Sequence, residues 1–425
     1  MPAEVELLVM EMGRKARAAS RLLAGLTTVQ RNAALLAMAD ALESARTEIL
    51  AANALDVAAA EAAPLSRAAI DRLRLDENRL SAMASAIRDV ARLPDPVGEI
   101  LSERERPNGL KIAKVRTPIG VVGIIYESRP NVTADAAVLC VKTGNAVLLR
   151  GGSESFQSNK AIAAALRDGC SRAGLPADAV QLVSVTDRAA VRALAQMDEF
   201  LDVIVPRGGH ALIRAVVEHA RMPVIKHYHG LCIVYVHDPC DIPMAARIAV
   251  NSKCQRPGVC NAMETLLVHQ NVAADFFRAA QEGFVAHAVE MRADARAARL
   301  LTDAGYPLVT AAREEDWTTE FLERILAVKI VDSLTEAVGH INSFGSHHSD
   351  AIVTTDAAAA EAFLAAVDSA AVYWNASTRF TDGGEFGFGA EIGISTDKLP
   401  ARGPMGLEEL TTYKYIVRGT GQIRE

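Results

Sequence analysis

The chain has 425 residues, and half of them are hydrophobic. A chain of this length is too long for one ordinary hydrophobic core, so two or three domains are predicted. Its net charge of −7 argues against a general nucleic-acid-binding protein, but it allows a local basic pocket for a phosphate. The six cysteines lack zinc-site or disulfide-scaffold spacing, so we expect no metal site. The N-terminus lacks a signal-peptide pattern and the longest apolar run, 119–126, cannot span a bilayer, so we expect a cytoplasmic protein with no membrane partner.

Helices are predicted from the start of the chain to about residue 93. The sequence from Thr27 to Gln30 matches a capping box at the start of a helix. A further helix is predicted over 77–92, because Pro94 disfavours its continuation. Alternating polar and apolar residues over 111–115 then predict a half-exposed strand.

Short apolar segments next alternate with helical stretches, which predicts a parallel sheet covered on both faces. The strands are predicted over 121–126, 146–149, 181–185 and 203–205. Ligands bind such sheets at the carboxyl ends of the strands. Glycine-rich segments follow two of these strands, at 150–153 and 207–209. They either present backbone N–H groups to a phosphate or make tight turns, and no G-x-G-x-x-G or P-loop accompanies them.

A second alternation of strands and helices begins near residue 231. Its strands are predicted over 231–236, 265–268, 325–331, 351–354 and 371–374, and its helices over 245–252, 273–286, 333–342 and 357–367. Residues 380–393 are rich in glycine and phenylalanine, and 411–417 is a further strand. A late, detached strand of this kind pairs with another element or with another subunit.

Cys260 is the candidate nucleophile. It lies in the stretch 251–262, which contains the cations Lys253 and Arg256 and no acidic residue. Nearby positive charge lowers the pKa of a thiol from its free value of about 8.5 and favours the reactive thiolate. Pro257-Gly258 breaks regular structure just before the cysteine, which favours an exposed thiol at a bend over a buried one.

Other residues compete for roles at such a site. Cys254 is the alternative nucleophile, although it lies nearer to a predicted helix. The oxyanion formed on attack needs hydrogen-bond donors, and the backbone N–H of Cys260 and a side chain from the 126–131 loop could serve. His227 and His229 could serve as the base of a cysteine hydrolase, or they could be surface histidines in a polar turn.

Charged residues in predicted loops are candidates for an anion site. Arg129, Arg256 and Arg379 lie near glycine-rich turns, so they either bind an anionic substrate or remain solvated. Glu320 and Glu323 precede a predicted strand, and from the residues alone they are expected to face solvent.

Four stretches, 120–131, 255–262, 380–393 and 403–414, resemble signature sequences of the γ-glutamyl phosphate reductases, a branch of the aldehyde dehydrogenase superfamily. The resemblance implies an aldehyde-dehydrogenase-like α/β fold with two parallel-sheet domains and a small β oligomerisation arm. The implied parts are an NADPH-binding domain over 1–104 and 117–238, a catalytic domain over 239–375 carrying Cys260, and an arm over 105–116 and 395–425. A homo-oligomer, dimer or tetramer, is expected.

The resemblance also implies an activity. It is the NADPH-dependent reduction of L-glutamyl 5-phosphate to L-glutamate 5-semialdehyde and phosphate, the second step of proline biosynthesis, through a thioester on Cys260. A separate glutamate kinase would supply the substrate, because this chain has no room for one.

Further site residues follow from the family's motifs. Ser128 or Asn131 would lie near the oxyanion. The cofactor would contact Arg150, Gly151, Gly152, Ser153, Gly208, Gly209, Glu320 (Glu323 being the alternative) and Phe386. The substrate would contact Arg129, Arg256, Asn375 and Arg379.

One departure from the wider superfamily bears on the reaction. Hydrolytic aldehyde dehydrogenases carry a Glu base in a Glu-Leu-Gly-Gly turn, and the corresponding turn here is His227-Tyr228-His229-Gly230. Without that carboxylate, a thioester is protected from water. Three alternatives stay open: another NAD(P)-dependent semialdehyde dehydrogenase, a cysteine hydrolase with His227 as base, and a non-enzymatic nucleotide-binding or scaffold protein.

Overall fold

The computed structural model describes residues 2–63, 65, 67–399 and 401–424. The chain divides into two units. Unit 1 comprises Met1–Lys226, Gly387–Gly393 and Met405–Glu425, and unit 2 comprises His227–Phe386 and Ile394–Pro404. The chain leaves unit 1 at Lys226. The division into a cofactor-binding domain and a catalytic domain stays a prediction. In the described residues, no helix is both long and apolar enough to cross a membrane.

Unit 1 begins with a helical layer. Its helices are α1 (Pro2–Leu23), α2 (Thr28–Ser44), α3 (Arg46–Ala62), α4 (Arg67–Leu73) and α5 (Glu77–Arg92). The predicted capping box is confirmed: the Gln30 backbone N–H donates to the Thr27 hydroxyl, and the Thr27 backbone N–H donates to the Gln30 side chain. Asp76 caps α5 in a similar way, and Leu93 ends it directly before Pro94. Capping and proline placement therefore set these helix ends, as expected.

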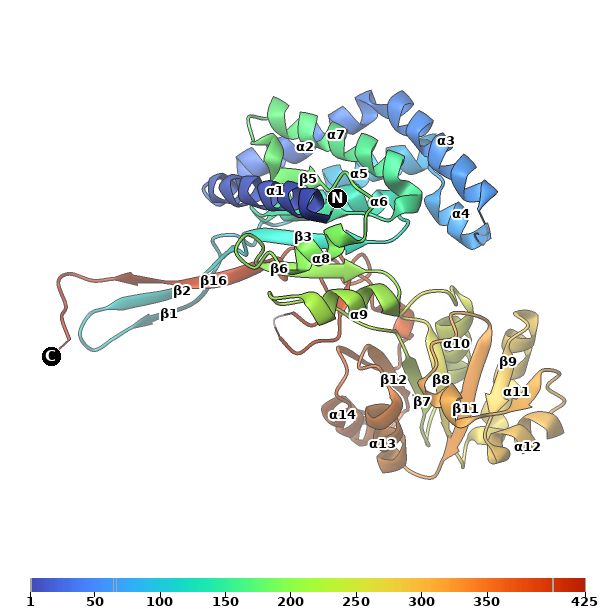
Figure 1. Cartoon of the computed structure of the whole chain (residues 1–425). Coiled ribbons are helices and arrows are strands. Elements are labelled where there is room, and N and C mark those ends of the chain that lie inside the picture. The colour runs from blue at the N-terminus through green and yellow to red at the C-terminus, as the bar shows by residue number, and fades with distance from the viewer. Residues whose placement is uncertain (1, 64, 66, 400, 425) are drawn as a thin grey trace. The chain divides into compact units, whose positions relative to one another are not determined.

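A four-stranded parallel sheet forms the centre of unit 1. Its strand order is β5-β4-β3-β6, with the bounds β3 (Val121–Tyr126), β4 (Ala146–Arg150), β5 (Val180–Leu182) and β6 (Val203–Arg207). The remaining helices are α6 (Pro130–Lys142), α7 (Phe156–Arg172), α8 (Ala189–Ala195) and α9 (His210–His219). Every residue of β3 is buried, as its unbroken apolar sequence predicts for a central parallel strand. Helices α2 and α7 pack against each other above the sheet (Figure 1).

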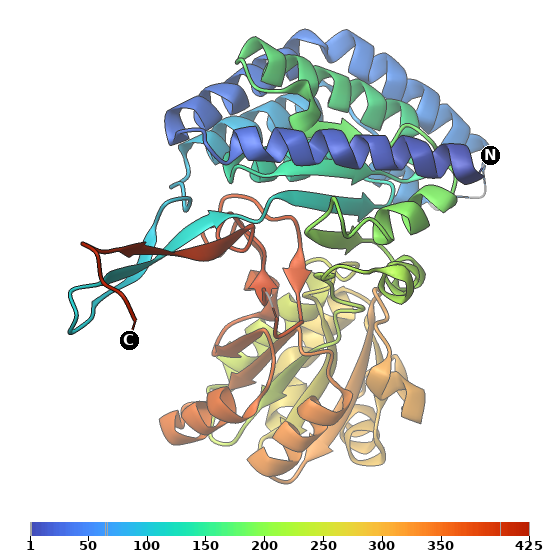
Figure 2. The same ribbon diagram turned by 60° about the vertical axis from the view of Figure 1, so that its left-hand side comes forward.

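A separate antiparallel sheet extends from unit 1 as a long ribbon (Figure 2). It has the strand order β1-β2-β16, with bounds β1 (Ile100–Glu105), β2 (Lys111–Pro118) and β16 (Thr411–Arg418). The two strands expected at 111–115 and 411–417 pair with each other, Val115 facing Lys414. Tyr413, Tyr415 and Val417 are exposed in this chain. The oligomerisation role assigned to this arm stays a prediction.

Unit 2 is built on a seven-stranded parallel sheet with the order β10-β9-β11-β8-β7-β12-β13. The strands are β7 (Cys232–Val236), β8 (Met263–His269), β9 (Glu290–Ala293), β10 (Val309–Ala311), β11 (Ile325–Val331), β12 (Ser349–Val353) and β13 (Ala371–Trp374). The helices are α10 (Ile242–Cys254), α11 (Ala273–Ala286), α12 (Ala295–Asp303), α13 (Leu334–Phe344) and α14 (Ala357–Ala366). Two short strands, β14 (Ile394–Ser395) and β15 (Gly403–Pro404), pair separately.

The sequence did not reveal β9, β10 and α12. Strand β9 contains Glu290 and Arg292 in only four residues, and its strand geometry comes from pairing with β11 and β10 on either side. Helix α12 is nine residues long and begins after the cap Asp294, whose carboxylate accepts from the Ala297 N–H. Long-range pairing therefore decides elements whose own sequence pattern is too short to be distinctive.

A buried carboxyl in β12 leads to a prediction about pH. The Asp350 carboxylate accepts hydrogen bonds from the Ile233 N–H at 2.8 Å and the Ser369 hydroxyl at 2.5 Å. Burial raises its pKa to about 7. Since an unfolded Asp titrates near about 3.9, the folded state binds the extra proton between these values. The stability that this group contributes is therefore full below pH of about 4 and declines as the pH rises towards 7.

We expect Asp350→Asn, which keeps a neutral acceptor for Ile233, to raise the melting temperature more at pH 8 than at pH 5. The corresponding free-energy gain at pH 8 is on the order of 1–3 kcal/mol. Thermal unfolding at both pH values tests this. An equal shift at the two pH values would show that Asp350 does not change protonation between them.

Candidate active site

The Cys260 loop lies between α10 and β8 in unit 2. Helix α10 is capped by Asp241 and ends at Cys254, and the chain then turns through Pro257 before β8 begins. Cys260 is half-buried, whereas Cys254 is buried at the helix end. Burial raises the pKa of the Cys254 thiol to about 11. Cys254 is therefore a poor nucleophile, and the assignment of Cys260 as the nucleophile stays a prediction.

Lys253 does not provide the free positive charge that the sequence suggested. Its ammonium group is fully buried and lies 2.5 Å from a carboxylate oxygen of Glu264, which is equally buried. The sequence did not suggest this ion pair, because Glu264 lies beyond the acid-free stretch 251–262 that contains Lys253. Of the two cations in the stretch 251–262, only Arg256 is exposed.

The backbone of Cys260 is packed tightly against the start of β7. A Cβ atom at Gly230 would lie 1.9 Å from the Cys260 carbonyl oxygen and 2.5 Å from its Cα, so only glycine fits there. The buried Cys232 thiol donates to the same carbonyl at 3.2 Å. Burial raises the pKa of Cys232 well above its usual value, which keeps this thiol protonated as a donor. These contacts fix the Cys260 backbone from one side.

Glu320 approaches the same place. One of its carboxylate oxygens accepts from the Gly230 N–H at 2.9 Å. Burial raises the pKa of Glu320, while the Gly230 N–H opposes that shift. Glu323 is exposed. The expectation that both residues face solvent is therefore wrong for Glu320, and Glu320 is the better candidate of the two for a ligand contact.

Two guanidinium groups gather beside the Cys260 loop. Arg379 donates from Nε to the Gln255 side chain at 2.8 Å. Its pKa is lowered first by burial and then by the nearby charge of Arg256. The Asn261 amide donates to the Thr381 carbonyl at 2.8 Å, which ties the segment carrying Arg379 to the loop. The pair of cations suits an anionic group bound next to the cysteine.

Two other predicted residues have structural partners in unit 2. His227 lies with Nδ1 2.7 Å from the Ile394 carbonyl and with its ring against that of His348. Asn375 has a φ of 58°, and its side-chain amide bonds the N–H and the carbonyl of Thr354. This amide therefore ties the residue after β13 to the residue after β12. Phe386 is exposed, and its role stays a prediction.

The loop after β4 forms the first half of the predicted cofactor site in unit 1. Arg150 donates from Nη2 to the Thr186 carbonyl at 3.1 Å, while its buried Nε has no hydrogen-bond partner within the part of the chain described. Burial and, to a smaller extent, Arg188 lower the pKa of Arg150, although Glu154 opposes the shift. A Cβ at Gly152 would lie 2.7 Å from a Glu154 carboxylate oxygen.

Ser128 and Asn131 have partners within unit 1. The Ser128 hydroxyl donates to Glu154 at 2.9 Å, so it belongs to the loop after β4 in this arrangement. Asn131 donates to Asp135 one turn further along α6, at 2.9 Å. Gly151 packs against Asn159, where a Cβ would lie 2.1 Å from the amide nitrogen. The catalytic roles predicted for Ser128 and Asn131 stay predictions.

The second glycine-rich turn already contacts a carboxylate. The Gly209 N–H, at the start of α9, donates to Glu127 at 3.0 Å. A Cβ at Gly208 would lie 2.5 Å from the Glu127 carboxyl carbon. The missing side chain at Gly208 therefore leaves room for the close approach of an acidic group, and the pyrophosphate contact expected at this turn stays a prediction. Glu127 stands within the resembling stretch 120–131, but nothing in the sequence singled it out.

Across the described ranges, no group of three or more His, Cys, Asp or Glu side chains could hold a metal ion.

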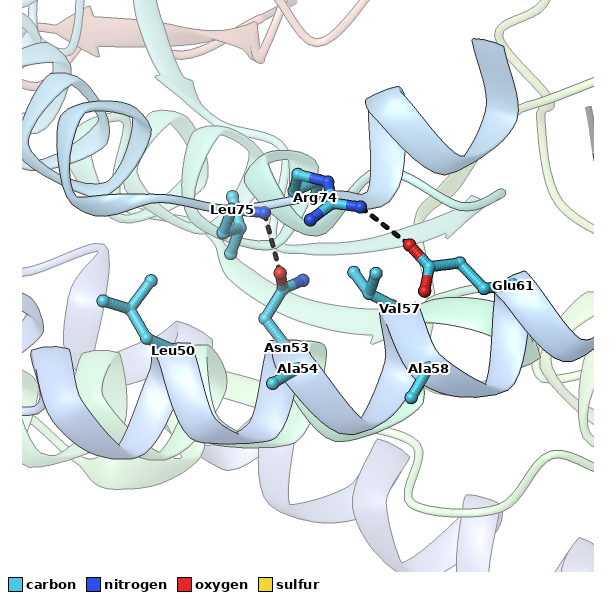
Figure 3. A pocket seen from close by; sticks show the side chains of 8 residues that line it. All are labelled: Leu50, Asn53, Ala54, Val57, Ala58, Glu61, Arg74 and Leu75. Carbon is cyan, nitrogen blue, oxygen red and sulfur yellow. Dashed lines mark hydrogen bonds and ion pairs between the residues drawn. The ribbon is translucent and has the colours of Figure 1, made fainter. Parts of the chain in front are cut away.

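A surface hollow in unit 1 lies between α3 and the segment after α4, with Asn53 in its wall and the exposed Arg74–Glu61 ion pair at its edge (Figure 3). Asn53 bonds the Leu75 N–H, the Leu73 carbonyl and the Ser158 hydroxyl, so this amide joins elements of unit 1.

Comparison with known proteins gives consistent matches. The model of the aldehyde dehydrogenase family matches residues 4–304. A γ-glutamyl phosphate reductase of Moorella thermoacetica is 56% identical over 99% of this chain and all of that protein. One from Opitutus terrae is 55% identical over the full length of both. The crystal structure of γ-glutamyl phosphate reductase from Thermotoga maritima superposes with a TM-score of 0.95 at 43% identity, covering 98% of this chain and all of that one.

Proposed function

The chain belongs to the γ-glutamyl phosphate reductases within the aldehyde dehydrogenase family, and we propose that it reduces L-glutamyl 5-phosphate with NADPH to L-glutamate 5-semialdehyde and phosphate. This reaction is the second step of proline biosynthesis. The observation that carries the proposal is the identity of more than half of the residues over essentially the full length of named reductases.

Cys260 acts as the nucleophile in this proposal. Its thiolate forms a bond to the acyl carbon while the bond from that carbon to the phosphate oxygen breaks, so phosphate leaves and a thioester remains. Arg256 and Arg379 stabilise the negative charge on the departing phosphate. When bound, the nicotinamide cofactor supplies the hydride that reduces the thioester. Breakage of the carbon–sulfur bond then releases the aldehyde and restores the Cys260 thiolate.

The surroundings of Cys260 support reduction over hydrolysis. The turn 227–230 contains no carboxylate. The carboxylate that does approach it, Glu320, accepts from the Gly230 N–H. A thioester on Cys260 therefore lacks the base that activates water in hydrolytic aldehyde dehydrogenases, and it persists until reduction or attack by phosphate.

Family membership implies a nicotinamide cofactor, and the loop after β4 fits its adenosine half. The buried Nε of Arg150 lacks a partner within the described chain, and Arg188 adds positive charge nearby. Two cations of this kind suit the extra phosphate of NADP. Glu154 and Ser128 would bond ribose hydroxyls. NADPH is therefore our proposed cofactor over NADH.

Arg379 provides a test of the anion site. We expect Arg379→Ala to raise the KM for phosphate, measured in the reverse direction, by about tenfold or more, because a charge-assisted bond is lost. The matched control is Arg278→Ala, which removes an exposed arginine paired with Asp275 on α11 and should leave this KM unchanged. Equal KM values in the two variants would contradict a phosphate contact by Arg379.

The reaction itself is tested by phosphate-dependent reduction of NADP with glutamate 5-semialdehyde. We expect NADPH to form continuously only when phosphate is present, because phosphate must release the acyl group from Cys260. Equal rates without phosphate would indicate a hydrolytic semialdehyde dehydrogenase instead. The homo-oligomer and the separate glutamate kinase, which the family resemblance implies, and the cytoplasmic location remain parts of the proposal.

A further inference from the structure

A buried ion pair closes the base of the Cys260 loop. Lys253 is in the last turn of α10 and Glu264 is the second residue of β8, so the pair joins the two ends of the loop. Their charged atoms lie 2.5 Å apart, and neither side chain has any exposure to solvent. Burial raises the pKa of Glu264 and lowers that of Lys253, which reflects the cost of removing both charges from water.

The second carboxylate oxygen of Glu264 holds a strained turn. It accepts from the Leu322 N–H at 3.1 Å. Leu322 has a φ of 56°, a left-handed conformation that is unfavourable for a leucine and persists only where surrounding contacts enforce it. The Leu322 carbonyl oxygen lies 3.6 Å from the position that a Cβ would take at Gly258, so the turn lies next to the Cys260 loop.

The same turn carries Glu320. Two residues before Leu322, Glu320 accepts from the Gly230 N–H, and Gly230 in turn abuts the carbonyl of Cys260. One carboxylate, Glu264, thus connects the loop of the nucleophile with the turn that presents Glu320. A shift of Leu322 would move Glu320 and the contacts around Cys260 together.

We propose that Lys253 and Glu264 are positioning residues, which hold the Cys260 loop and the Glu320–Leu322 turn in the arrangement that the reductase reaction needs. The proposal rests on the assignment of Cys260 as nucleophile. Lys253 fixes the rotamer of Glu264, and Glu264 fixes the backbone at Leu322. Neither residue contacts the substrate in this role.

The energetics separate positioning from stability. A buried ion pair that is replaced by apolar residues of similar volume is often as stable as before, or more stable. If the pair served only stability, removing both charges would therefore leave activity unchanged. If the pair serves positioning, removing both charges lowers activity even in a stable fold, because the Leu322 N–H loses its acceptor.

The test compares two double variants of the full chain. Lys253→Met/Glu264→Leu removes both charges and the acceptor for Leu322, whereas Lys253→Met/Glu264→Gln removes the charges and keeps that acceptor. We expect the first to retain the wild-type melting temperature or exceed it, while kcat/KM falls by about 100-fold, as displacement of reacting groups by about 1 Å does. The second should recover most of that loss.

Two further readouts do not depend on stability. The KM for NADPH should rise in the Met/Leu variant if Glu320 is displaced, and the rate of alkylation of Cys260 by iodoacetamide should change. If the Met/Leu variant does not fold, the same measurements are made on Glu264→Asp. The shorter Asp side chain keeps a negative charge for Lys253 but moves the carboxylate away from the Leu322 N–H. Wild-type kcat/KM, KM for NADPH and alkylation rate in the folded variant would overturn the proposal.

Cys260→Ala is assayed in parallel. If Cys260→Ala retains activity, the proposed function itself fails. If it is inactive while the Met/Leu variant behaves as wild type, only the positioning role is wrong.

Discussion

Replacement of Cys260 by alanine is expected to lower kcat/KM for the phosphate-dependent reaction by about 10⁴-fold or more, because no thioester can form without the nucleophile. Binding of NADPH, followed by quenching of intrinsic fluorescence or by calorimetry, should be unchanged. The side chain is half-buried in a loop, so the loss of one sulfur atom should leave the melting temperature close to that of the wild type. Activity and folding are thereby separated in one variant.

Cys254→Ala is the matched control, since this cysteine lies six residues earlier at the end of α10. Its thiol is buried, and burial raises its pKa to about 11, so it contributes little thiolate at neutral pH. We expect kcat/KM within about twofold of the wild type and a modest loss of stability of about 1 kcal/mol from the small cavity. Loss of activity in Cys254→Ala with full activity in Cys260→Ala would reverse the assignment.

The second large effect is expected at Gly230. A methyl group there would lie 1.9 Å from the Cys260 carbonyl oxygen and 2.5 Å from its carbonyl carbon. Both contacts are with backbone atoms, so Gly230→Ala must displace the chain at one side or the other. Displacement of a nucleophile by about 1 Å costs on the order of 100-fold in rate. We therefore expect kcat to fall by about 100-fold in any folded fraction of this variant.

Gly339→Ala provides the control for glycine replacement in the same unit. Gly339 lies in α13, and a Cβ there would meet no atom within 4 Å. Alanine in a helix is more stable than glycine by about 0.5–1 kcal/mol. We expect unchanged kcat and a slightly higher melting temperature. Wild-type kcat in Gly230→Ala would show that the Cys260 loop adjusts freely to the added methyl group.

The arrangement of elements was largely predictable because its sequence signals are local. The buried parallel strand 121–126 is a continuous apolar run, and the strand 325–331 is apolar except for Lys329; the observed strands have the same bounds as predicted. The ends of α5 follow from Asp76 and Pro94. By contrast, the two half-buried residues of β9, Glu290 and Arg292, carry opposite charges, and the geometry of this strand depends on its neighbours, so no local pattern predicts it.

The candidate site was predictable only in part, for a related reason. The bend before Cys260 is a local feature, and it separated this cysteine from the buried Cys254. The ion pair of Lys253 with Glu264 could not be predicted from the sequence. The two residues lie on opposite sides of the loop in the chain, and only the helix–loop–strand geometry brings them together. The approach of Glu127 to Gly209 joins residues 82 positions apart in the chain. Partners of this kind depend on the fold, whereas the sequence shows only the residue types.

A single-turnover experiment with glutamate 5-semialdehyde and NADP in the absence of phosphate tests directly whether Cys260 carries a thioester. Covalent catalysis through Cys260 predicts a burst of one NADPH per chain, a glutamyl thioester on Cys260 detected by mass spectrometry after rapid quenching, and continued turnover only when phosphate is added. Steady NADPH formation without phosphate, or a full burst in Cys260→Ala, would contradict it.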